Sequence, residues 1–223
     1  MAYFTPAFLS FFRDLAANNH REWFQENKKT YEQQVKKPFE RLVTDLIDRI
    51  HADDPAIMID AKDAIFRINR DIRFSTDKTP YKTNVSAAIS PGGRKDMTYP
   101  GLYIELKAEE IGIYGGLYMP DKDLLHRVRS HIAATLDELE SMLGDPAFKK
   151  EYGTLRGDQH KRVPAEFQEA AKRQPLIANK AFYYYTKLPA TLLTTEHLLD
   201  VLMEKYFIAK PMKEYLTRAA QGE

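Results

Sequence analysis

The sequence contains no cysteine and no long apolar run. With 0 Cys in 223 residues, disulfide bonds, thiolate nucleophiles and cysteine-based zinc sites are excluded. No stretch of about 18 apolar residues occurs, so we expect no membrane-spanning helix. The first residues, MAYFTPAFLSFFRDL, lack a basic segment, and charged residues interrupt their apolar run, which argues against a signal peptide. We therefore expect a cytoplasmic protein that does not associate with membranes.

The chain also lacks an excess of charge of either sign. The 33 Lys and Arg residues are balanced by 32 Asp and Glu residues, for a net charge of +1. Proteins that coat nucleic acid are usually strongly basic, so we do not expect nucleic acid as the main partner. The length predicts a single domain over residues 1–223. The hydrophobic share of 43% is sufficient for a sizeable core.

Helical periodicity dominates residues 6–50. Thr5-Pro6 is typical of an N-cap followed by proline in the first turn, and Phe8, Phe12 and Leu15 follow at helical spacing. A second helical pattern begins near His20 and continues toward Ile50. Pro38 lies inside it, and because proline lacks an N–H and clashes with the preceding turn, we expect a kink or break there.

Strand-like alternation dominates residues 64–120, where apolar residues recur at every second position in four segments. These segments begin near Phe66, Val85, Leu102 and Ile111. The short links favour a mostly antiparallel sheet, and Ser90-Pro91-Gly92-Gly93 is interpreted as a hairpin turn. The last segment predicts one face with Gly112, Tyr114, Gly116 and Tyr118, and a core face that includes Met119.

The remainder predicts mainly helix. Asp121 caps an expected helix over about 121–143, and residues 145–180 are expected to be irregular, with short helices opening at Pro146 and Pro164. Residues 181–187 predict one more strand. Within 145–220 we then expect a helix capped by Thr195 and a final helical piece that starts at Pro211. The fold class is therefore α+β: a mostly antiparallel sheet with N-terminal and C-terminal helices packed on it.

Positive charge is concentrated in FRINRDIRFSTDKTPYKTN, residues 66–84. Its cations exceed its two acids by three, while the rest of the chain sums to −2. Arginine offers a planar donor fork suited to phosphate, and lysine offers a point charge. The positive residues are Arg67, Arg70, Arg73, Lys78 and Lys82, and the acids are Asp71 and Asp77. The segment predicts either an anion clamp or a structural ion-pair network, and the two hypotheses can hold for different residues.

The same segment resembles a bacterial family catalogued as domain of unknown function 2461. The pattern FRI…RD…RFS…DK…PYK carries the resemblance, together with LAANNHREWFQENKKTYEQQVKKPF upstream and GIYGGLYMP and LLHRVRSHI downstream. The resemblance covers nearly the whole chain and implies no established activity. It implies only that ten residues occupy the signature positions of the family: Arg67, Arg70, Asp71, Arg73, Phe74, Asp77, Lys78, Pro80, Tyr81 and Lys82.

Two further groups are candidate binding residues. Arg21 and Trp23 lie beside amides at a helix junction and either line a ligand pocket or pack in the core. Tyr114 and Tyr118 are separated by Gly116, which leaves room for a ligand or a packed element to approach the backbone. Arg67 and Asn69 alternate away from the core residues of their segment, so we expect that they can share the face of these tyrosines.

No metal or cofactor site is predicted. His126 and His131 are five residues apart, which does not align them on one helix face. The leading hypothesis is therefore a pocket for a phosphate-bearing small molecule or nucleotide, with Tyr81, Tyr114 and Tyr118 as walls. Asp71 orients an arginine or, if desolvated, acts as a base; whether a reaction is catalysed stays open. The alternatives are an interaction or scaffold protein whose motif is a salt-bridge network, and a nucleic-acid binder.

Overall fold

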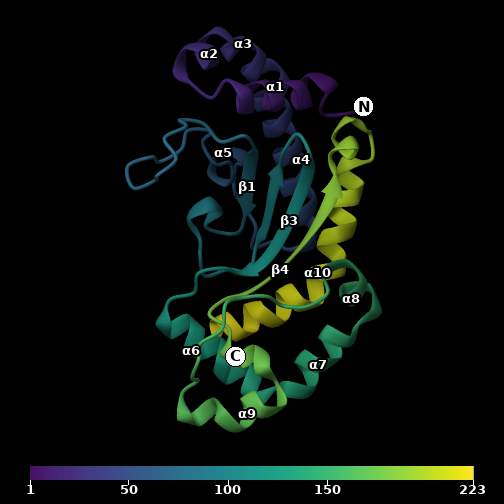
Figure 1. Ribbon diagram of the computed structural model, residues 1–223. Helices are drawn as coiled ribbons and strands as arrows, with labels where there is room; N and C mark the ends of the chain where they lie inside the picture. Colours follow the sequence, from purple (N-terminus) through teal and green to yellow (C-terminus); the bar gives the residue numbers. More distant parts are fainter. Residues whose placement is uncertain (223) are drawn as a thin grey trace. The chain divides into compact units, whose positions relative to one another are not determined.

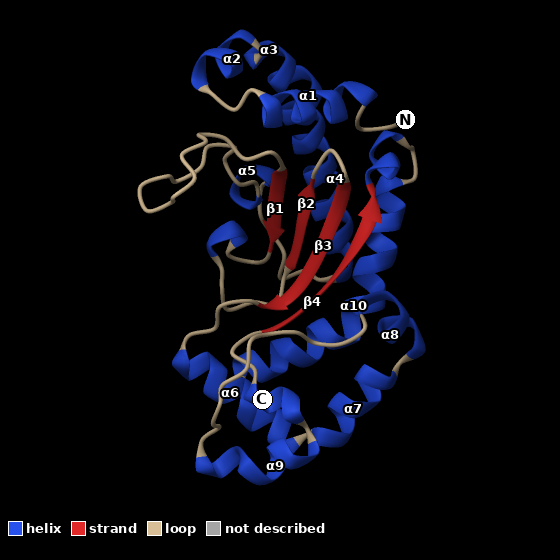
Figure 2. Cartoon of the chain, viewed as in Figure 1, coloured by secondary structure: helices blue, strands red, loops and turns tan. Residues whose placement is uncertain are grey.

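The α+β class is confirmed. The computed structural model describes residues 1–222 and contains a four-stranded antiparallel sheet in the order β1-β2-β3-β4, with helices at both ends of the chain. Figure 1 follows the elements in chain order, and Figure 2 separates helices from strands. The strands are β1 (Val85–Ile89), β2 (Leu102–Leu106), β3 (Glu110–Leu117) and β4 (Phe182–Pro189).

The helices fall into three groups. Before the sheet are α1 (Pro6–Ala17), α2 (Arg21–Glu26), α3 (Lys28–Thr30), the π-helical segment η1 (Tyr31–Lys36), α4 (Lys37–Asp53) and α5 (Ala61–Ala64). Within and after the first three strands are η2 (Gly93–Lys95), α6 (Lys122–Ala134), α7 (Leu136–Gly144), α8 (Pro146–Tyr152), η3 (Ala165–Phe167), α9 (Gln168–Arg173) and η4 (Pro175–Ala178). After β4 come η5 (Ala190–Thr194) and α10 (Leu198–Gln221). No helix within residues 1–222 is both long enough and apolar enough to cross a bilayer.

Contacts within the chain gather in two compact units. Unit 1 comprises Met1–Arg94, Tyr103–Ile113 and Lys187–Met203; unit 2 comprises Lys95–Leu102, Tyr114–Thr186 and the chain from Glu204 onward. Strands β3 and β4 and helix α10 each contribute residues to both units. That the whole chain forms a single domain stays a prediction.

The core of unit 1 is built by α1 and α4. Phe8, Phe12 and Leu15 of α1 are buried, and α4 buries the stripe from Phe39 to Ile50 while packing against β1 and α5. The expected N-cap is present, since the Thr5 hydroxyl accepts a hydrogen bond from the Ala7 N–H at 3.3 Å. Figure 2 shows α4 behind the strands.

The helical pattern from His20 to Ile50 is divided before Pro38 and not at it. Helix α2 ends at Glu26, the short helix α3 covers Lys28–Thr30, and α4 begins at Lys37 after the π-helical residues 31–36. A kink at Pro38 itself stays a prediction. Pro38 is then in the first turn of α4. The Lys37 N–H, directly before the proline, still donates to the Glu32 carbonyl, so the π-helical turn leads into α4 without an end between them.

Unit 2 has its own core. Leu117 of β3 and Phe182 and Tyr184 of β4 pack with α6 residues such as Val128 and with Leu216 of α10. Asp121 and Asp145 cap α6 and α8 as predicted, accepting hydrogen bonds at 2.8 Å from the N–H groups of Leu124 and Phe148.

Two expected helix boundaries are wrong. The helix predicted over 121–143 is divided between α6 and α7 at Thr135, whose hydroxyl donates to the His131 carbonyl at 2.7 Å and so competes with helical pairing. Pro211 does not begin a helix but lies inside α10. The neighbouring residues Met212, Tyr215 and Leu216 are buried, and this burial outweighs the loss of one backbone hydrogen bond.

Three further expectations are also wrong. Thr195 does not cap α10, which begins at Leu198; its hydroxyl instead donates to the Leu192 carbonyl at 2.9 Å. Met119 is not in the core but is 68% exposed, because β3 has already ended at Leu117. The loop after β1 is longer than a hairpin turn and contains η2.

The segment beginning near Phe66 forms no continuous strand. Its backbone makes separate hydrogen bonds: the Phe66 N–H donates to Ser86, the Arg70 N–H to Pro80, and the Lys82 N–H to Ile68, each at 2.9 Å. Only isolated bridges, Ile65 with Ala87 and Asn69 with Tyr81, have strand geometry. Pro80 cannot donate to a ladder, so regular pairing ends there.

Gly116 provides a test of how closely β3 and β4 approach. Its φ is +99°, and an added Cβ would lie 2.2 Å from the Phe182 carbonyl oxygen. We therefore expect Gly116→Ala to lower the free energy of unfolding by about 2 kcal/mol or more. Gly144→Ala is the control, since nothing lies within 4 Å of its added Cβ, and it should change stability by less than about 1 kcal/mol. Urea denaturation of both variants measures the difference; equal effects would contradict the close approach.

Candidate functional site

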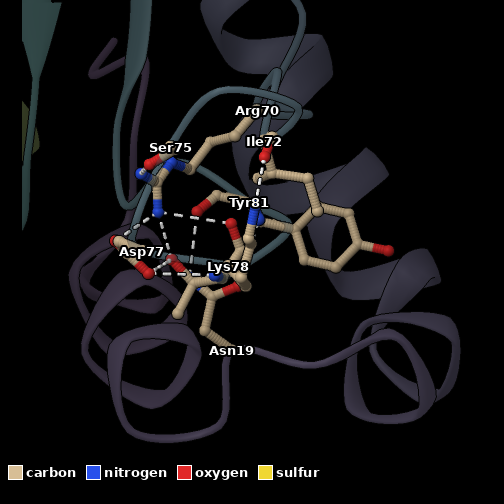
Figure 3. A network of polar contacts seen from close by, with 8 residues as sticks. Asn19, Arg70, Ile72, Ser75, Asp77, Lys78 and Tyr81 are labelled. Atoms are coloured by element: carbon tan, nitrogen blue, oxygen red, sulfur yellow. Dashed lines mark hydrogen bonds and ion pairs between the residues drawn. The ribbon is translucent and has the colours of Figure 1, made fainter.

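Residues 66–84 are called the signature segment below. Arg70 organises this segment by binding to groups within it. Its side chain is 25% exposed, and its Nη1 atom donates to the Asp77 carboxylate, to the Thr79 hydroxyl and, at 3.2 Å, to the Thr79 carbonyl. Figure 3 shows the guanidinium pointing toward Asp77 rather than outward. We call residues 70–79 the braced loop, because one planar donor group ties its first residue to Asp77 and Thr79 at its end.

Asp77 is the acceptor at the centre of this brace. Besides Arg70, it accepts hydrogen bonds from the N–H and the hydroxyl of Thr79, each at 2.9 Å. The Thr79 N–H, then Arg70 and then the Thr79 hydroxyl lower the pKa of Asp77 from 3.8 to about 2. The carboxylate is therefore ionised throughout the neutral range, as the ion pair requires.

Two more cations of the segment also have partners inside the loop. Arg73 forms a bidentate pair with Asp71, with Nε–Oδ1 and Nη2–Oδ2 distances of 2.9 and 2.6 Å. Lys78 donates to the Ile72 carbonyl at 2.9 Å. Three of the five positive side chains thus contact groups of the loop itself, two of them through ion pairs with Asp71 and Asp77 and one through a backbone carbonyl.

Asp71 is an acceptor for Arg73. Its side chain is 44% exposed, and hydrogen bonds from the side chain and backbone of Arg73 lower its pKa to about 2, against a smaller opposing effect of burial. A low pKa does not favour a base near neutral pH, and the role of Asp71 as a base stays a prediction.

Tyr81 anchors the end of the segment to the N-terminal helices. The side chain of Asn19 accepts from the Tyr81 N–H at 3.1 Å and donates to the Tyr81 carbonyl at 2.9 Å. The Tyr81 ring is 5% exposed and stacks on Phe24 with centroids 4.0 Å apart. Tyr81 therefore packs in the core of unit 1, whereas Phe74, in the braced loop, is 96% exposed.

Arg67 and Lys82 differ from the other three cations. Arg67 is exposed, and neither side chain forms a hydrogen bond or a carboxylate contact that the described residues record. The Lys82 ammonium lies 5.2 Å from the centroid of the Phe66 ring. Burial lowers the pKa of Lys82, the positive charge of Arg67 lowers it further, and Glu105 opposes both.

The two N-terminal candidates, Arg21 and Trp23, are not part of the hydrogen-bond network of the signature segment. Trp23 is partly buried, with its ring 5.6 Å from that of Phe11, so it contributes to the aromatic core of unit 1. Arg21 is exposed at the first position of α2. That either residue binds a ligand stays a prediction.

Tyr114 and Tyr118 belong to unit 2, whereas the signature segment belongs to unit 1. Their neighbours are tyrosines of β4: the Tyr114 and Tyr185 ring centroids are 5.4 Å apart, and those of Tyr118 and Tyr183 are 5.6 Å apart. The sequence contained a signal for these neighbours, because period-2 alternation in AFYYYTK places Tyr183 and Tyr185 on one face. That the tyrosines share a face with Arg67 and Asn69 stays a prediction.

Two shallow hollows on the described surface do not involve the signature segment. One, of about 620 Å³, is lined by residues of the N-terminus and α4, including Tyr3, Arg41 and Asp45. The other, of about 430 Å³, is lined mainly by α7, α8 and α10 residues such as Met142, Phe148 and Met212. Within residues 1–222 no three His, Asp or Glu side chains gather as metal ligands would.

Comparison with protein families gives a match over nearly the whole chain. Residues 7–215 match the model described as "Conserved hypothetical protein (DUF2461)", so the resemblance carried by the signature segment is confirmed. No curated protein matches the chain.

The brace predicts the titration of Asp77. Because its pKa is depressed in the folded protein, the ionised carboxylate stabilises the loop above pH 3.8, and this contribution is lost as pH falls through about 2. In Arg70→Met the midpoint should rise but stay below 3.8, since the Thr79 N–H remains. Carboxyl ¹³C NMR measures it, with Arg13→Met as the control. An unchanged Asp77 midpoint in Arg70→Met would contradict the brace.

Proposed function

We propose that this chain, which belongs to the DUF2461 family of conserved hypothetical proteins, binds a small phosphate-bearing molecule through Arg67 and Lys82. The braced loop is then a structural support between the two cations, which lie three residues before it and three residues after it. The two hypotheses drawn from the signature segment thus apply to different residues: an ion-pair network for Arg70, Arg73 and Lys78, and an anion site for Arg67 and Lys82.

The observation that carries the proposal is the environment of Lys82. Its ammonium is half-buried, beside an aromatic ring and a second cation. Partial desolvation and repulsion from Arg67 both disfavour its charged form. An anion bound between Lys82 and Arg67 reverses both effects, because it replaces lost hydration and neutralises the repulsion.

The chemistry of the two side chains favours a phosphate group. Arg67 is exposed and offers its guanidinium fork, which matches two phosphate oxygens at once, while Lys82 adds a point charge. Tyr103 and Glu105 lie nearby, since Phe66 packs on the Tyr103 ring and Glu105 attracts Lys82. Glu105 is held at 2.5 Å by Lys107, so its charge is already compensated when an anion arrives.

A second candidate function is a protein interaction through the braced loop. The observation that favours it is Phe74, which is 96% exposed on a loop fixed by Arg70, Asp77 and Thr79. The Phe74 ring, with the Arg73 guanidinium 5.9 Å from its centroid, offers an exposed aromatic and cationic surface for a partner to cover. This function does not require a free cation and therefore predicts no response to phosphate.

Thermal unfolding with inorganic phosphate tests the anion site. A ligand at a hundred times its Kd stabilises the folded state by about 2.7 kcal/mol, which raises Tm by several degrees. We expect this shift in the parent protein, at constant ionic strength against chloride. Lys82→Met and Arg67→Met should each lose most of it, and the loss should be largest at low salt, where screening is weakest.

The matched control is Lys28→Met, which removes the same charge from an exposed position on α3 and should keep the full shift. A phosphate shift that is absent from the parent, or equally reduced in Lys28→Met, would reject the site. If the parent protein shows no phosphate shift but binds a protein partner that Phe74→Ser no longer binds, the interaction function replaces the anion site.

A further inference from the structure

Strand β4 has an aromatic face that the core does not use. Along it, Phe182 and Tyr184 are buried at 0% and 4% exposure, while Tyr183 and Tyr185 alternate to the opposite face. Tyr114 and Tyr118 join them from the β3 side, within the same unit. We call these four residues the tyrosine platform. Tyr118 is its most accessible part, at 62% exposure.

Glycines in β3 hold the platform against the core. An added Cβ at Gly115 would lie 2.4 Å from the Tyr184 hydroxyl, and one at Gly116 would lie 2.2 Å from the Phe182 carbonyl. The absence of these side chains lets the Tyr184 ring fill the space beneath β3. Tyr114, Tyr183 and Tyr185 therefore stand on closely packed strands, and Tyr118 lies in the bend directly after β3.

Arg156 adds positive charge at the edge of the platform. Its backbone pairs with that of Tyr183 through hydrogen bonds of 2.7 and 3.2 Å, so the two side chains emerge on the same face. Its guanidinium lies over the Tyr185 ring, 4.6 Å from the centroid. The Arg156 side chain is exposed, and among residues 1–222 no carboxylate lies within ion-pair distance of it.

This combination narrows the class of ligand. Aromatic rings alone would suit any flat apolar group, but an adjacent guanidinium without a carboxylate partner favours a ligand that is both flat and anionic. Nucleobases stack on tyrosine rings irrespective of base identity, and arginine pairs with the attached phosphate. A sheet face that contacts only water is usually polar, whereas this face carries four tyrosines beside an arginine.

We infer that the tyrosine platform and Arg156 bind a nucleoside phosphate, with the base stacked on Tyr118 and the phosphate paired with Arg156. The inference goes beyond the proposed function, because it uses only residues of unit 2 and does not require Arg67 or Lys82. It is a binding site, and no chemical step is assigned to it.

Calorimetric titration with AMP, adenosine and inorganic phosphate tests each part of the site. We expect the parent protein to bind AMP more tightly than adenosine. Tyr118→Leu should weaken the binding of both by about tenfold or more, the effect of losing one base–aromatic stack. Tyr118→Phe keeps the ring and should retain binding. Arg156→Met should weaken AMP about tenfold and leave adenosine unchanged.

Two control variants in unit 2 separate the site from general effects. Phe207→Leu removes another exposed aromatic ring and Arg162→Met another exposed guanidinium, and neither should change AMP binding. Circular dichroism melts confirm that each variant is folded. Equal losses in Tyr118→Leu and Phe207→Leu, or no AMP binding by the parent at millimolar concentration, would overturn the inference. Binding of a short single-stranded oligonucleotide without any binding of AMP would also overturn it.

The outcome is independent of the proposed function. Adenosine carries no phosphate, so its binding reports on the tyrosine platform without Arg67 and Lys82. Inorganic phosphate carries no base, and a thermal shift that Arg156→Met retains and Lys82→Met loses reports on those two cations without the second site. Loss of the phosphate shift in Lys82→Met together with no adenosine binding would support the first site and reject the second, and the reverse result would do the opposite.

Discussion

The candidate site depends on the interaction of Arg70 with Asp77 and Thr79. Without these acceptors for the guanidinium, no side-chain contact would offset the conformational entropy that residues 70–79 lose by keeping one conformation. With it, the loop closes on itself, Asp71 and Arg73 pair at its surface, and Lys78 caps the Ile72 carbonyl. Three of the five cations of the segment are thus bound within the loop, whereas Arg67 and Lys82, outside it, form no ion pair among the described residues and are the cations of the proposed anion site.

The signature segment is also anchored to the N-terminal helices of unit 1. Asn19 bonds both polar groups of the Tyr81 backbone, and the Tyr81 ring stacks on Phe24 of α2. The downstream end of residues 66–84 is therefore joined to the N-terminal helices by two hydrogen bonds and a ring stack. Loss of the Asn19 amide would leave the N–H and the carbonyl of Tyr81 without these partners.

Aromatic residues in the two units serve different purposes. In unit 1 they mostly fill space, as the contacts of Phe11 with Trp23 and Tyr31 show. In unit 2 half of those on β4 face away from the core, beside an arginine that has no carboxylate partner within the described residues. Packing therefore accounts for the first group, whereas the second group is the one for which we infer a flat anionic ligand.

The sequence by itself determined the α+β class, the approximate positions of β1 to β4, the caps at Thr5, Asp121 and Asp145, and the family, because these depend on local periodicity and on side chains that bond to nearby backbone. It also predicted a strand from Phe66, where the fold has only isolated bridges. It did not determine that Pro211 lies within α10, since burial of Met212 and Leu216 by residues distant in sequence outweighs the local cost. Nor could it say which cations were already paired. Arg70 and Lys82 are chemically similar in the sequence, and only the fold brings an acceptor to one and an aromatic ring and a second cation to the other. Charge pairing is set by distances across the chain, and those distances exist only in the folded protein.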